Sequence, residues 1–400
     1  MHTDVGRTTA TAKPSRIVGL DVARALALLG MIAAHTMDRV DPEAPGGIDP
    51  LFQIVAGRSS AVFAVLAGVS LALVTRDAPG PTVAGLRTAY RWQILTRALL
   101  IAVLGLILGL AGAGVAVILT YYGLLFVLAL PVLAWGWRPL ALLALGWGVL
   151  APVASTLLRP LLPDPTREVP SPLSLAAPLQ LLSELAVTGY YPVLTWGTYL
   201  FAGMAVGRLD LRRPRVSRAL TVGGTLLAVT ALGVSSVVTG SATARRALLA
   251  TFGDDTWQAL DTSLRSGMFG TFPLGSWWWL LVWSPHTGSI VDLAHTMGSA
   301  LAVLGLCLLL TQGRSARVSR GWQIVFGAGT MTLTLYTLHV LMLSASVVLP
   351  LLHSTVFNVV GVLWLGALAA VARAPGPLET LVSRCAQTVA QQLTRTRRSS

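Results

Sequence analysis

The stretch LDVARALALLGMIAAHTMD, from Leu20 to Asp38, has the length and apolar content of a membrane-spanning helix, yet it contains an arginine and a histidine. Both residue types are costly in hydrocarbon, so their presence inside a span indicates a function. Arg24 and His35 are eleven positions apart, which is about three helical turns, so they share one helix face about 16 Å apart along the axis. The segment therefore predicts a span with a polar group near each end.

The rest of the chain repeats this apolar character. Of its 400 residues 54% are hydrophobic and 11% are charged, whereas soluble domains carry about 25% charged residues. The fold class predicted is an all-α, polytopic integral membrane protein with about ten transmembrane helices. The predicted spans are 17–37, 51–74, 92–112, 115–135, 139–158, 187–207, 217–238, 287–311, 323–349 and 352–372.

Three regions follow from this hydropathy pattern. Residues 1–15 are predicted to be a disordered cytoplasmic tail, and residues 16–373 the transmembrane domain. Residues 374–400 are basic, with apolar residues at helical spacing, which predicts a cytoplasmic tail with an amphipathic helix on the inner membrane surface.

The basic residues give an independent test of topology. The formal net charge is +13, and most of the 29 Lys and Arg residues fall in alternate segments between the spans. By the positive-inside rule, this alternation places both termini in the cytoplasm. The charge therefore indicates a lipid bilayer as the partner of the chain, and it does not indicate nucleic acid.

The ionisable residues of the first span suggest a use for its polar face. His35 has an ordinary pKa near 6.5 and could serve as a base at neutral pH, with Asp38 three residues later to orient its ring. Arg24 could bind the phosphates of a cytoplasmic acyl-coenzyme A, and Asp21 is within reach of Arg24 for an intrahelical pair that completes this candidate cofactor site. In the alternative interpretation, Asp21 and Arg24 are an interfacial pair and His35 only packs between helices.

Most other unusual polar residues fall in the outer half of the predicted bilayer, which predicts a shared polar site there. Arg58 could donate to the thioester carbonyl as charge develops, or it could pair with Asp38 or Asp49 and only position helices. The candidate substrate-binding residues are Tyr122, Tyr191, His286, Asp292, His295, Tyr336 and His339. Core packing is an equal alternative for Tyr336 and His339. Because no HExxH or paired-cysteine pattern occurs in the sequence, we expect no metal.

Several of these segments resemble known families. Arg24 and His35, with ten residues between them, resemble the first-helix Arg-x10-His pattern of bacterial acyltransferase-3 membrane O-acyltransferases, and FAVLAG (63–68) resembles their second-helix motif. The chain more closely resembles bacterial membrane proteins grouped with the heparan-α-glucosaminide N-acetyltransferase catalytic domain and with a large uncharacterised membrane family. The segments that carry this resemblance are GRSSAVFAVLAGVSLAL, YYGLLFVLALPVL, YYPVLTWGTYLFAGMAVGRLDL, SPHTGSIVDLAHTMGSALAVLGLCLLL, LTLYTLHVL and GPLETL.

The resemblance implies transfer of an acyl group, with acetyl expected, from cytoplasmic acyl-CoA (acetyl-CoA) to an extracytoplasmic sugar, glycolipid or cell-wall acceptor. The O-acyltransferase motif carries over His35 as the catalytic base or acyl carrier, Arg24 as its partner, and Asp21 as the acidic residue before that arginine, whereas the N-acetyltransferase branch places its active histidine in the loop after the first helix, where residues 38–50 contain none. The location that it implies is a bacterial plasma membrane. The chain departs from the pattern at Ala25, where glycine usually follows the arginine, and at residues 57–60, where the N-acetyltransferase branch carries an acidic residue and Phe-Pro.

Two other function classes are compatible with the sequence. Intramembrane arginine, histidine and tyrosine residues could form the substrate or proton pathway of a transporter, although no internal repeat is evident. A non-catalytic scaffold or sensor is the third interpretation. The acceptor, N- versus O-acylation and the oligomeric state, with a homodimer as one option, are likewise open.

Overall fold

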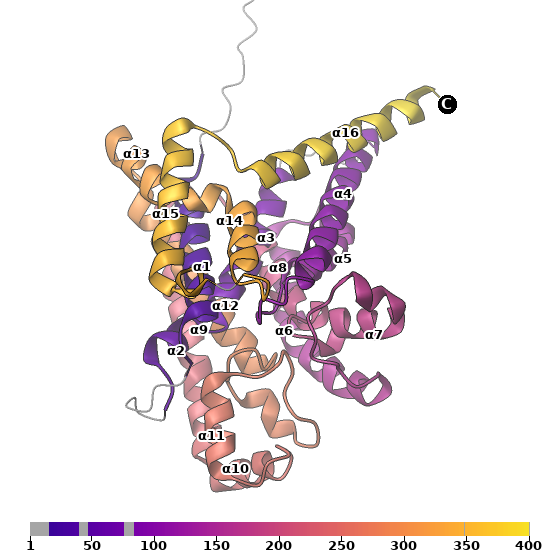
Figure 1. The fold of residues 1–400 in the computed structure, drawn as a ribbon, viewed down its shortest axis with the longest axis vertical. Coiled ribbons are helices and arrows are strands. Elements are labelled where there is room, and N and C mark those ends of the chain that lie inside the picture. The colour runs from indigo at the N-terminus through magenta and orange to yellow at the C-terminus, as the bar shows by residue number, and fades with distance from the viewer. Residues whose placement is uncertain (1–15, 40–46, 76–83, 348, 400) are drawn as a thin grey trace, which may run out of the picture.

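The computed structural model describes residues 16–39, 47–75, 84–347 and 349–399. Helices make up the regular structure of this part of the chain, and no β-strand occurs in it. The helices form one bundle, with α16 (Pro377–Ser399) at one end and α10 (Ala242–Leu249) with α11 (Trp257–Ser266) at the other (Figure 1). The predicted N-terminal tail 1–15 lies outside the described residues.

Every predicted span contains an apolar helix. Within the described ranges, seven helical segments are long and apolar enough to cross a membrane, and three more apolar helices are shorter. The seven are α1 (Val18–Thr36), α2 (Pro50–Val55) with α3 (Arg58–Val74), α4 (Ala84–Gly109), α6 (Trp137–Leu158), α9 (Pro214–Gly240), α12 (Ile290–Thr311) and α15 (Thr355–Ala372). The shorter three are α5 (Leu119–Ala129), α8 (Val193–Gly207) and α14 (Thr332–Met342). The polytopic all-helical class is therefore confirmed, while the count of ten crossings and the cytoplasmic termini stay predictions.

The second predicted span contains a break that hydropathy does not reveal. Asp49 accepts a hydrogen bond from the Phe52 amide and caps α2, which has Pro50 in its first turn. The helix stops at Val55, and Gly57 has a φ of 71°, a conformation that glycine adopts without steric cost. The chain re-enters a helix at Arg58, so this arginine lies at the start of α3 and beside the end of α2.

The centre of the bundle is built by close helix contacts at small residues. α1 packs against α3, α12, α15 and the short helix η6 (Gly327–Thr330). α3 also packs along α8, where a Cβ added at Gly68 would lie 2.2 Å from the Leu200 carbonyl oxygen and one at Gly203 would lie 2.0 Å from that of Val65. Small residues allow membrane helices to approach this closely, which explains the physical role of the FAVLAG segment.

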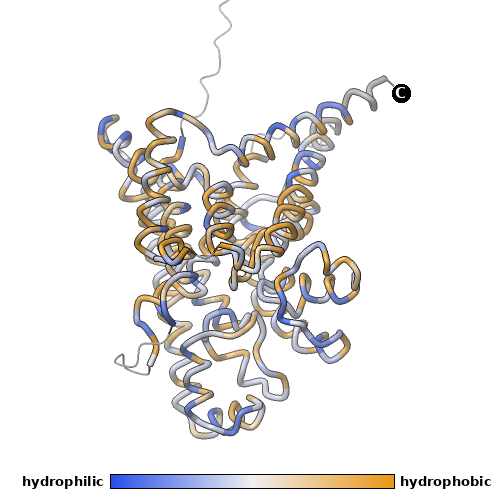
Figure 2. The backbone as a smooth tube through the Cα atoms, in the orientation of Figure 1, coloured by the Kyte–Doolittle hydropathy of each residue, from blue (hydrophilic) through white to orange (hydrophobic). Residues whose placement is uncertain are grey.

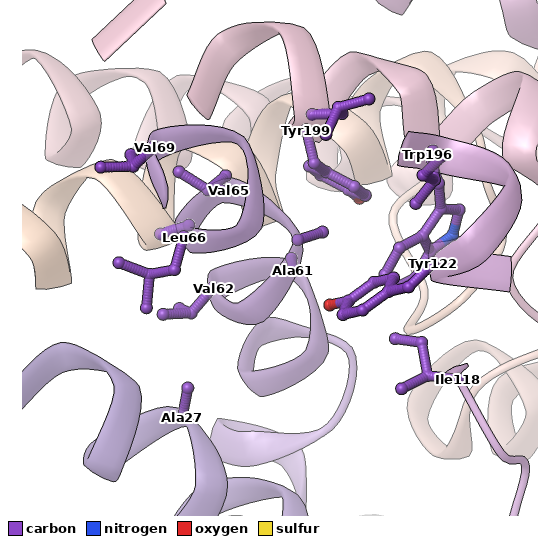
Figure 3. Packing of buried hydrophobic residues seen from close by; sticks show 14 of the residues in the cluster. Ala27, Ala61, Val62, Val65, Leu66, Val69, Ile118, Tyr122, Trp196 and Tyr199 are labelled. Atoms are coloured by element: carbon purple, nitrogen blue, oxygen red, sulfur yellow. The ribbon is translucent and has the colours of Figure 1, made fainter. Parts of the chain in front are cut away.

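Larger side chains fill the spaces that the glycines leave. Figure 3 shows Val62 and Leu66 of α3 on the side of Ala27 of α1, and Ala61 on the side of Tyr122. All five side chains are buried. The helix α3 therefore forms the contact between α1 and the α5–α8 side of the bundle, and it fixes α1 in the interior.

The two ends of the bundle differ in character. Figure 2 shows hydrophobic residues concentrated in the long helices, and more hydrophilic residues at the end that carries α10 and α11. That end has its own small core, which includes Leu248, Leu260, Phe272 and Trp279. At the opposite end, Glu379 of α16 accepts hydrogen bonds from the Leu333 amide and the Thr334 hydroxyl, which ties the tail to the start of α14.

The predicted C-terminal amphipathic helix is present as α16. Its apolar residues Val382, Ala386 and Ala390 are buried, and the helix packs along α4, where Arg97 donates to the Ser383 hydroxyl at 2.9 Å. The apolar face of α16 is therefore covered in part by protein. Its location on the inner membrane surface stays a prediction.

The connecting segments contain further short helices. These are η1 (Leu130–Val132), η2 (Arg159–Leu161), η3 (Pro172–Ala176), α7 (Pro178–Ser183), η4 (Glu184–Thr188), η5 (Trp277–Leu281), α13 (Ala316–Val325) and η7 (Pro350–His353). Several of them border the cavity described next.

Candidate active site

A cavity of about 1250 Å³ adjoins the C-terminal end of α1. Its wall includes the end of α1 and the turn between α2 and α3. The rest of the wall is formed by loop segments, which lie after α4, after α6, before α8, around α11 and before α12. Small-molecule sites usually measure roughly 300–1,000 Å³, so this space is large enough for a substrate of several sugar units or a lipid-linked headgroup. Of the residues predicted from the sequence, His35, Tyr191 and His286 line it.

His35 is held by a chain of polar side chains that crosses three helices. Its Nδ1 lies 3.2 Å from Nε2 of His339 on α14, and the two rings are inclined by 6°. Nδ1 of His339 lies 2.9 Å from Oδ1 of Asn358 on α15. The Asn358 amide group donates to the carbonyl oxygens of Leu352 and Ser354 at 2.7 and 3.0 Å. His339 and Asn358 are buried, whereas His35 lines the cavity.

The prediction that Asp38 orients His35 is corrected by this arrangement. The helix α1 ends at Thr36, and its C-cap Met37 has an extended conformation with φ −84° and ψ 148°. Asp38 therefore does not occupy the helical position three residues after His35, and its side chain is exposed. His339, and not Asp38, is the side chain that contacts His35, the predicted base. His339 therefore does not line the acceptor pocket, contrary to the prediction from the sequence.

Aromatic rings form one wall of the cavity. The His286 ring centroid lies 4.6 Å from that of Tyr190 and 5.7 Å from that of Tyr191, and Phe269 packs on Tyr190 at 5.0 Å. Burial lowers the pKa of His286 to about 4, and the charge of Arg39 acts in the same direction. Tyr190 and Tyr191, whose ordinary pKa is near 10, lie in the same wall. These groups are consequently neutral at pH 7 and offer ring faces with hydrogen-bonding edges, which suits a sugar.

Another part of the wall is cationic. Arg39, Arg159 and Arg167 line the cavity together with a single acidic residue, Glu168. Arg159 donates to the Phe272 carbonyl at 2.5 Å and its guanidinium lies 5.0 Å from the centre of the Phe272 ring. Its Nε and Nη2 atoms are buried and have no hydrogen-bond partner among the described residues. A half-buried guanidinium with two buried, unused donor atoms is costly unless an anion or polar group meets it.

The N-terminal part of α1 lies away from this cavity. The predicted pair is present, with Arg24 Nη1 donating to Asp21 at 3.0 Å, and Arg24 Nη2 also donates to Ser70 of α3 at 2.8 Å. Arg16 forms a second ion pair with Asp21. Met31, Ala34 and His35 are the residues of α1 that line the cavity, so it does not extend to Arg24.

Arg58, His295 and Asp292 form a separate cluster that does not line the cavity. Arg58 Nε donates to His295 Nε2 at 2.9 Å, and the guanidinium lies 4.9 Å from the centre of the Trp283 ring. His295 Nδ1 lies 3.0 Å from the Ala228 carbonyl of α9. The Asp292 carboxylate accepts from the Gly288 amide at 2.9 Å. These contacts join α3, α9 and α12, and they favour the helix-positioning role of Arg58 over the carbonyl-donor role.

Tyr122 and Tyr336 are also core residues. The hydroxyl of Tyr336 accepts a hydrogen bond from the Ile118 amide at 3.4 Å. The Tyr122 ring is buried beside Phe126 and points toward α3 in Figure 3. Neither tyrosine lines the cavity. In addition, no group of three or more His, Cys, Asp and Glu side chains in the described part of the chain could hold a metal ion.

A sequence model of the catalytic domain of heparan-alpha-glucosaminide N-acetyltransferase matches residues 16–238, which is more than half of the chain. The chain belongs to this family. The match begins just before α1 and ends in α9, so it includes Arg24, His35 and the close α3–α8 contact. No curated protein matches the chain. The family resemblance stated above is thus confirmed, and the protein is a multi-pass transmembrane acetyltransferase.

For this N-acetyltransferase family member, sequence reasoning missed several cavity residues. Arg39, Arg159 and Arg167 lie at span ends or in loops, where arginine is ordinary, so their position in the sequence carries no signal. Asn358 was detectable, because it is an amide inside the otherwise apolar segment TVFNVVGVLWLG. The part of the chain after residue 238, which includes His339 and Asn358, lies outside the family match.

Proposed function

We propose that the protein transfers an acetyl group from acetyl-coenzyme A to an acceptor bound in the cavity beside His35, on the extracytoplasmic side of a bacterial plasma membrane. The observation that carries the proposal is that the histidine of the first span lines a large cavity while its ring is held from behind by His339. A positioned base with free access to a substrate is what acyl transfer requires.

In the proposed reaction, the imidazole of His35 takes the proton from the acceptor hydroxyl or amine. The acceptor oxygen or nitrogen bonds to the thioester carbonyl carbon, the carbon–sulfur bond breaks, and the departing thiolate of coenzyme A takes up the proton from His35. If His35 carries the acetyl group covalently, its Nε2 bonds to the thioester carbonyl carbon and the carbon–sulfur bond breaks to release the thiolate; the acceptor then bonds to the acetyl carbon, the bond to Nε2 breaks, and the acceptor proton passes to the thiolate.

The wall chemistry supports an acceptor class. Tyr190, Tyr191 and His286 present aromatic surface on which a sugar ring can lie. The cationic excess of Arg39, Arg159 and Arg167 over Glu168 favours an acceptor that also carries negative charge. We therefore propose an acidic glycan or a phosphate-linked glycolipid of the cell envelope as the acceptor.

The donor is proposed to bind at the inner end of α1. Arg16, Asp21 and Arg24 form a charged cluster there, joined to Ser70 of α3. Ala27 and Leu28 are buried between this cluster and the cavity. Passage of a thioester arm to His35 therefore requires α1 and its neighbours to separate at these residues, which is a conformational step in the proposed cycle.

The proposal is tested in proteoliposomes with radiolabelled acetyl-coenzyme A on the side of the charged cluster and envelope glycolipids on the other. We expect acetylation of the lipid-linked fraction together with release of coenzyme A. His35→Ala should abolish both, whereas His353→Ala, which alters an exposed histidine of η7, should retain them. Flux of a solute without coenzyme A release would instead support the transporter interpretation, and a fully active His35→Ala protein would refute the role of this residue.

A further inference from the structure

The two imidazole rings of His35 and His339 meet edge to edge. Their centroids are 5.4 Å apart, and the facing nitrogens are 3.2 Å apart. The centroid separation exceeds the nitrogen separation by close to the sum of the two distances from an imidazole centre to its ring nitrogen. Both nitrogens therefore lie near the line that joins the ring centres. With the rings inclined by only 6°, this is the geometry of an in-plane N–H···N hydrogen bond and not that of face-to-face stacking.

The direction of that hydrogen bond follows from Asn358. Both donors of its amide group are used by the carbonyl oxygens of Leu352 and Ser354. The reverse orientation of the amide would place its oxygen against two carbonyl oxygens, which is repulsive. Its Oδ1 therefore faces His339, and since an amide oxygen only accepts, His339 Nδ1 must carry the proton.

The proton position of His35 follows from that of His339. Neutral His339 with its proton on Nδ1 has a lone pair on Nε2, which accepts a hydrogen bond from the Nδ1–H of His35. The remaining nitrogen of His35, Nε2, then carries the lone pair. Nδ1 is occupied by His339, so Nε2 is the nitrogen available to a substrate in the cavity that His35 lines.

We infer that Asn358 and His339 are positioning residues that set the tautomer of His35 and leave its Nε2 unprotonated for the reaction. The inference rests on the proposed function for the identity of that reaction. Neither residue touches the substrate, and both act through the ring of His35. The neutral amide of Asn358 takes the place that a carboxylate occupies in many catalytic triads, so it orients the relay without adding charge to a membrane interior.

The tautomer is measured directly by nitrogen-15 solid-state NMR of the full-length protein, labelled at histidine, in lipid bilayers at neutral pH. The sequence contains six histidines, and His35→Gln and His339→Gln variants assign the two relevant sets of signals. We expect both rings to be neutral with the proton on Nδ1. A neutral His35 with its proton on Nε2 would overturn the inference, whatever the acetyl-transfer activity of the preparation.

Kinetics supply the second test. Asn358→Leu should lower kcat by about 10- to 100-fold with little change in KM, because the base His35 is still present but its ring is no longer held in position. His339→Gln, which retains an acceptor oxygen near the former Nε2 position, should keep more activity than His339→Leu. His339 contacts His35, and Arg39 and His286 line the same cavity, so the pH dependence of kcat should change when His339 is replaced.

A matched control separates positioning from simple helix packing. Thr36 of α1 hydrogen-bonds to Thr355 of α15 at 2.9 Å, which joins the same two helices without contact to the imidazole chain. Thr36→Val should therefore preserve kcat and the NMR signals of His35. Equal losses in Thr36→Val and Asn358→Leu would show that only helix packing matters and would overturn the inference. Absence of acetyl transfer in the wild-type protein, with the expected tautomer observed, would instead refute the proposed function.

Discussion

Nδ1 of His35 lies 3.2 Å from Nε2 of His339, although 304 positions separate the two residues in the chain. The contact joins the first apolar helix to α14 and, through Asn358, to α15. Buried polar networks of this kind are stable only when every member has a partner. Each ring nitrogen of His35 and His339 has a hydrogen-bond partner, except the nitrogen of His35 that is available to the cavity.

Replacement of His35 by Gln should remove catalysis while preserving the structure. General-base residues contribute about 10²- to 10⁴-fold to rate, so we expect kcat to fall by a factor of that size. Glutamine can still hydrogen-bond to His339, so the thermal unfolding temperature in detergent should change little. A variant with wild-type kcat would contradict the assignment of His35 as the base.

Arg159→Gln should weaken binding of an acidic acceptor. A hydrogen bond to a charged group contributes about 1.5–3 kcal/mol, so the acceptor KM should rise roughly 10- to 100-fold while the KM for acetyl-coenzyme A stays unchanged. The measurement is initial-rate kinetics with acidic and neutral glycolipids in parallel. Arg245→Gln is the control, because Arg245 pairs with Asp261 at 2.9 Å and does not line the cavity. Equal effects of the two variants would argue against an anion-binding role.

Gly203→Ala should destabilise the bundle. A Cβ at this position would lie 2.0 Å from the Val65 carbonyl oxygen of α3, so the two helices would have to move apart. Overpacking in a close contact costs about 1–3 kcal/mol, and the unfolding temperature should fall. Gly223→Ala on α9 is the control, because a Cβ there meets no atom within 4 Å. A wild-type unfolding temperature for Gly203→Ala would contradict the close packing of α3 on α8.

The stability of the protein should decrease as the pH is lowered from 6.5 toward 4. Burial lowers the pKa of His286 from 6.5 to about 4, so between these values the unfolded chain binds a proton at this residue that the folded protein does not. Stability therefore rises with pH across this window and is fully present above 6.5. Thermal unfolding at several pH values should show a smaller slope for His286→Phe than for the wild type. An unaltered slope in His286→Phe would contradict the prediction.

Much of the fold is determined by sequence-local physics. Hydropathy over about 20 residues locates apolar helices because transfer into a bilayer depends mainly on composition, and each predicted span contains an apolar helix in the structure. The Asp21–Arg24 pair was also predictable, since residues three apart on a helix are neighbours. His35 was identifiable because an ionisable residue inside a span is rare.

The composition of the site was decided by tertiary structure. Asp38 was expected beside His35 on the assumption that the helix continues, but α1 ends at Thr36 and the third position is lost. The partner is His339, and its own partner is Asn358, which reach His35 only because α14 and α15 pack against α1. Hydropathy reports which segments enter the membrane, but it does not report which face each helix turns toward its neighbours.

The amino-acid sequence by itself thus determined the all-helical membrane architecture, the family and the histidine of the first span, because these depend on local composition and spacing. Only the tertiary structure decided that His339 and Asn358 hold this histidine, that Arg159 lines its cavity, and that Arg24 does not. The physical reason is that such contacts depend on the rotation and depth of packed helices, which long-range packing sets after each helix has formed.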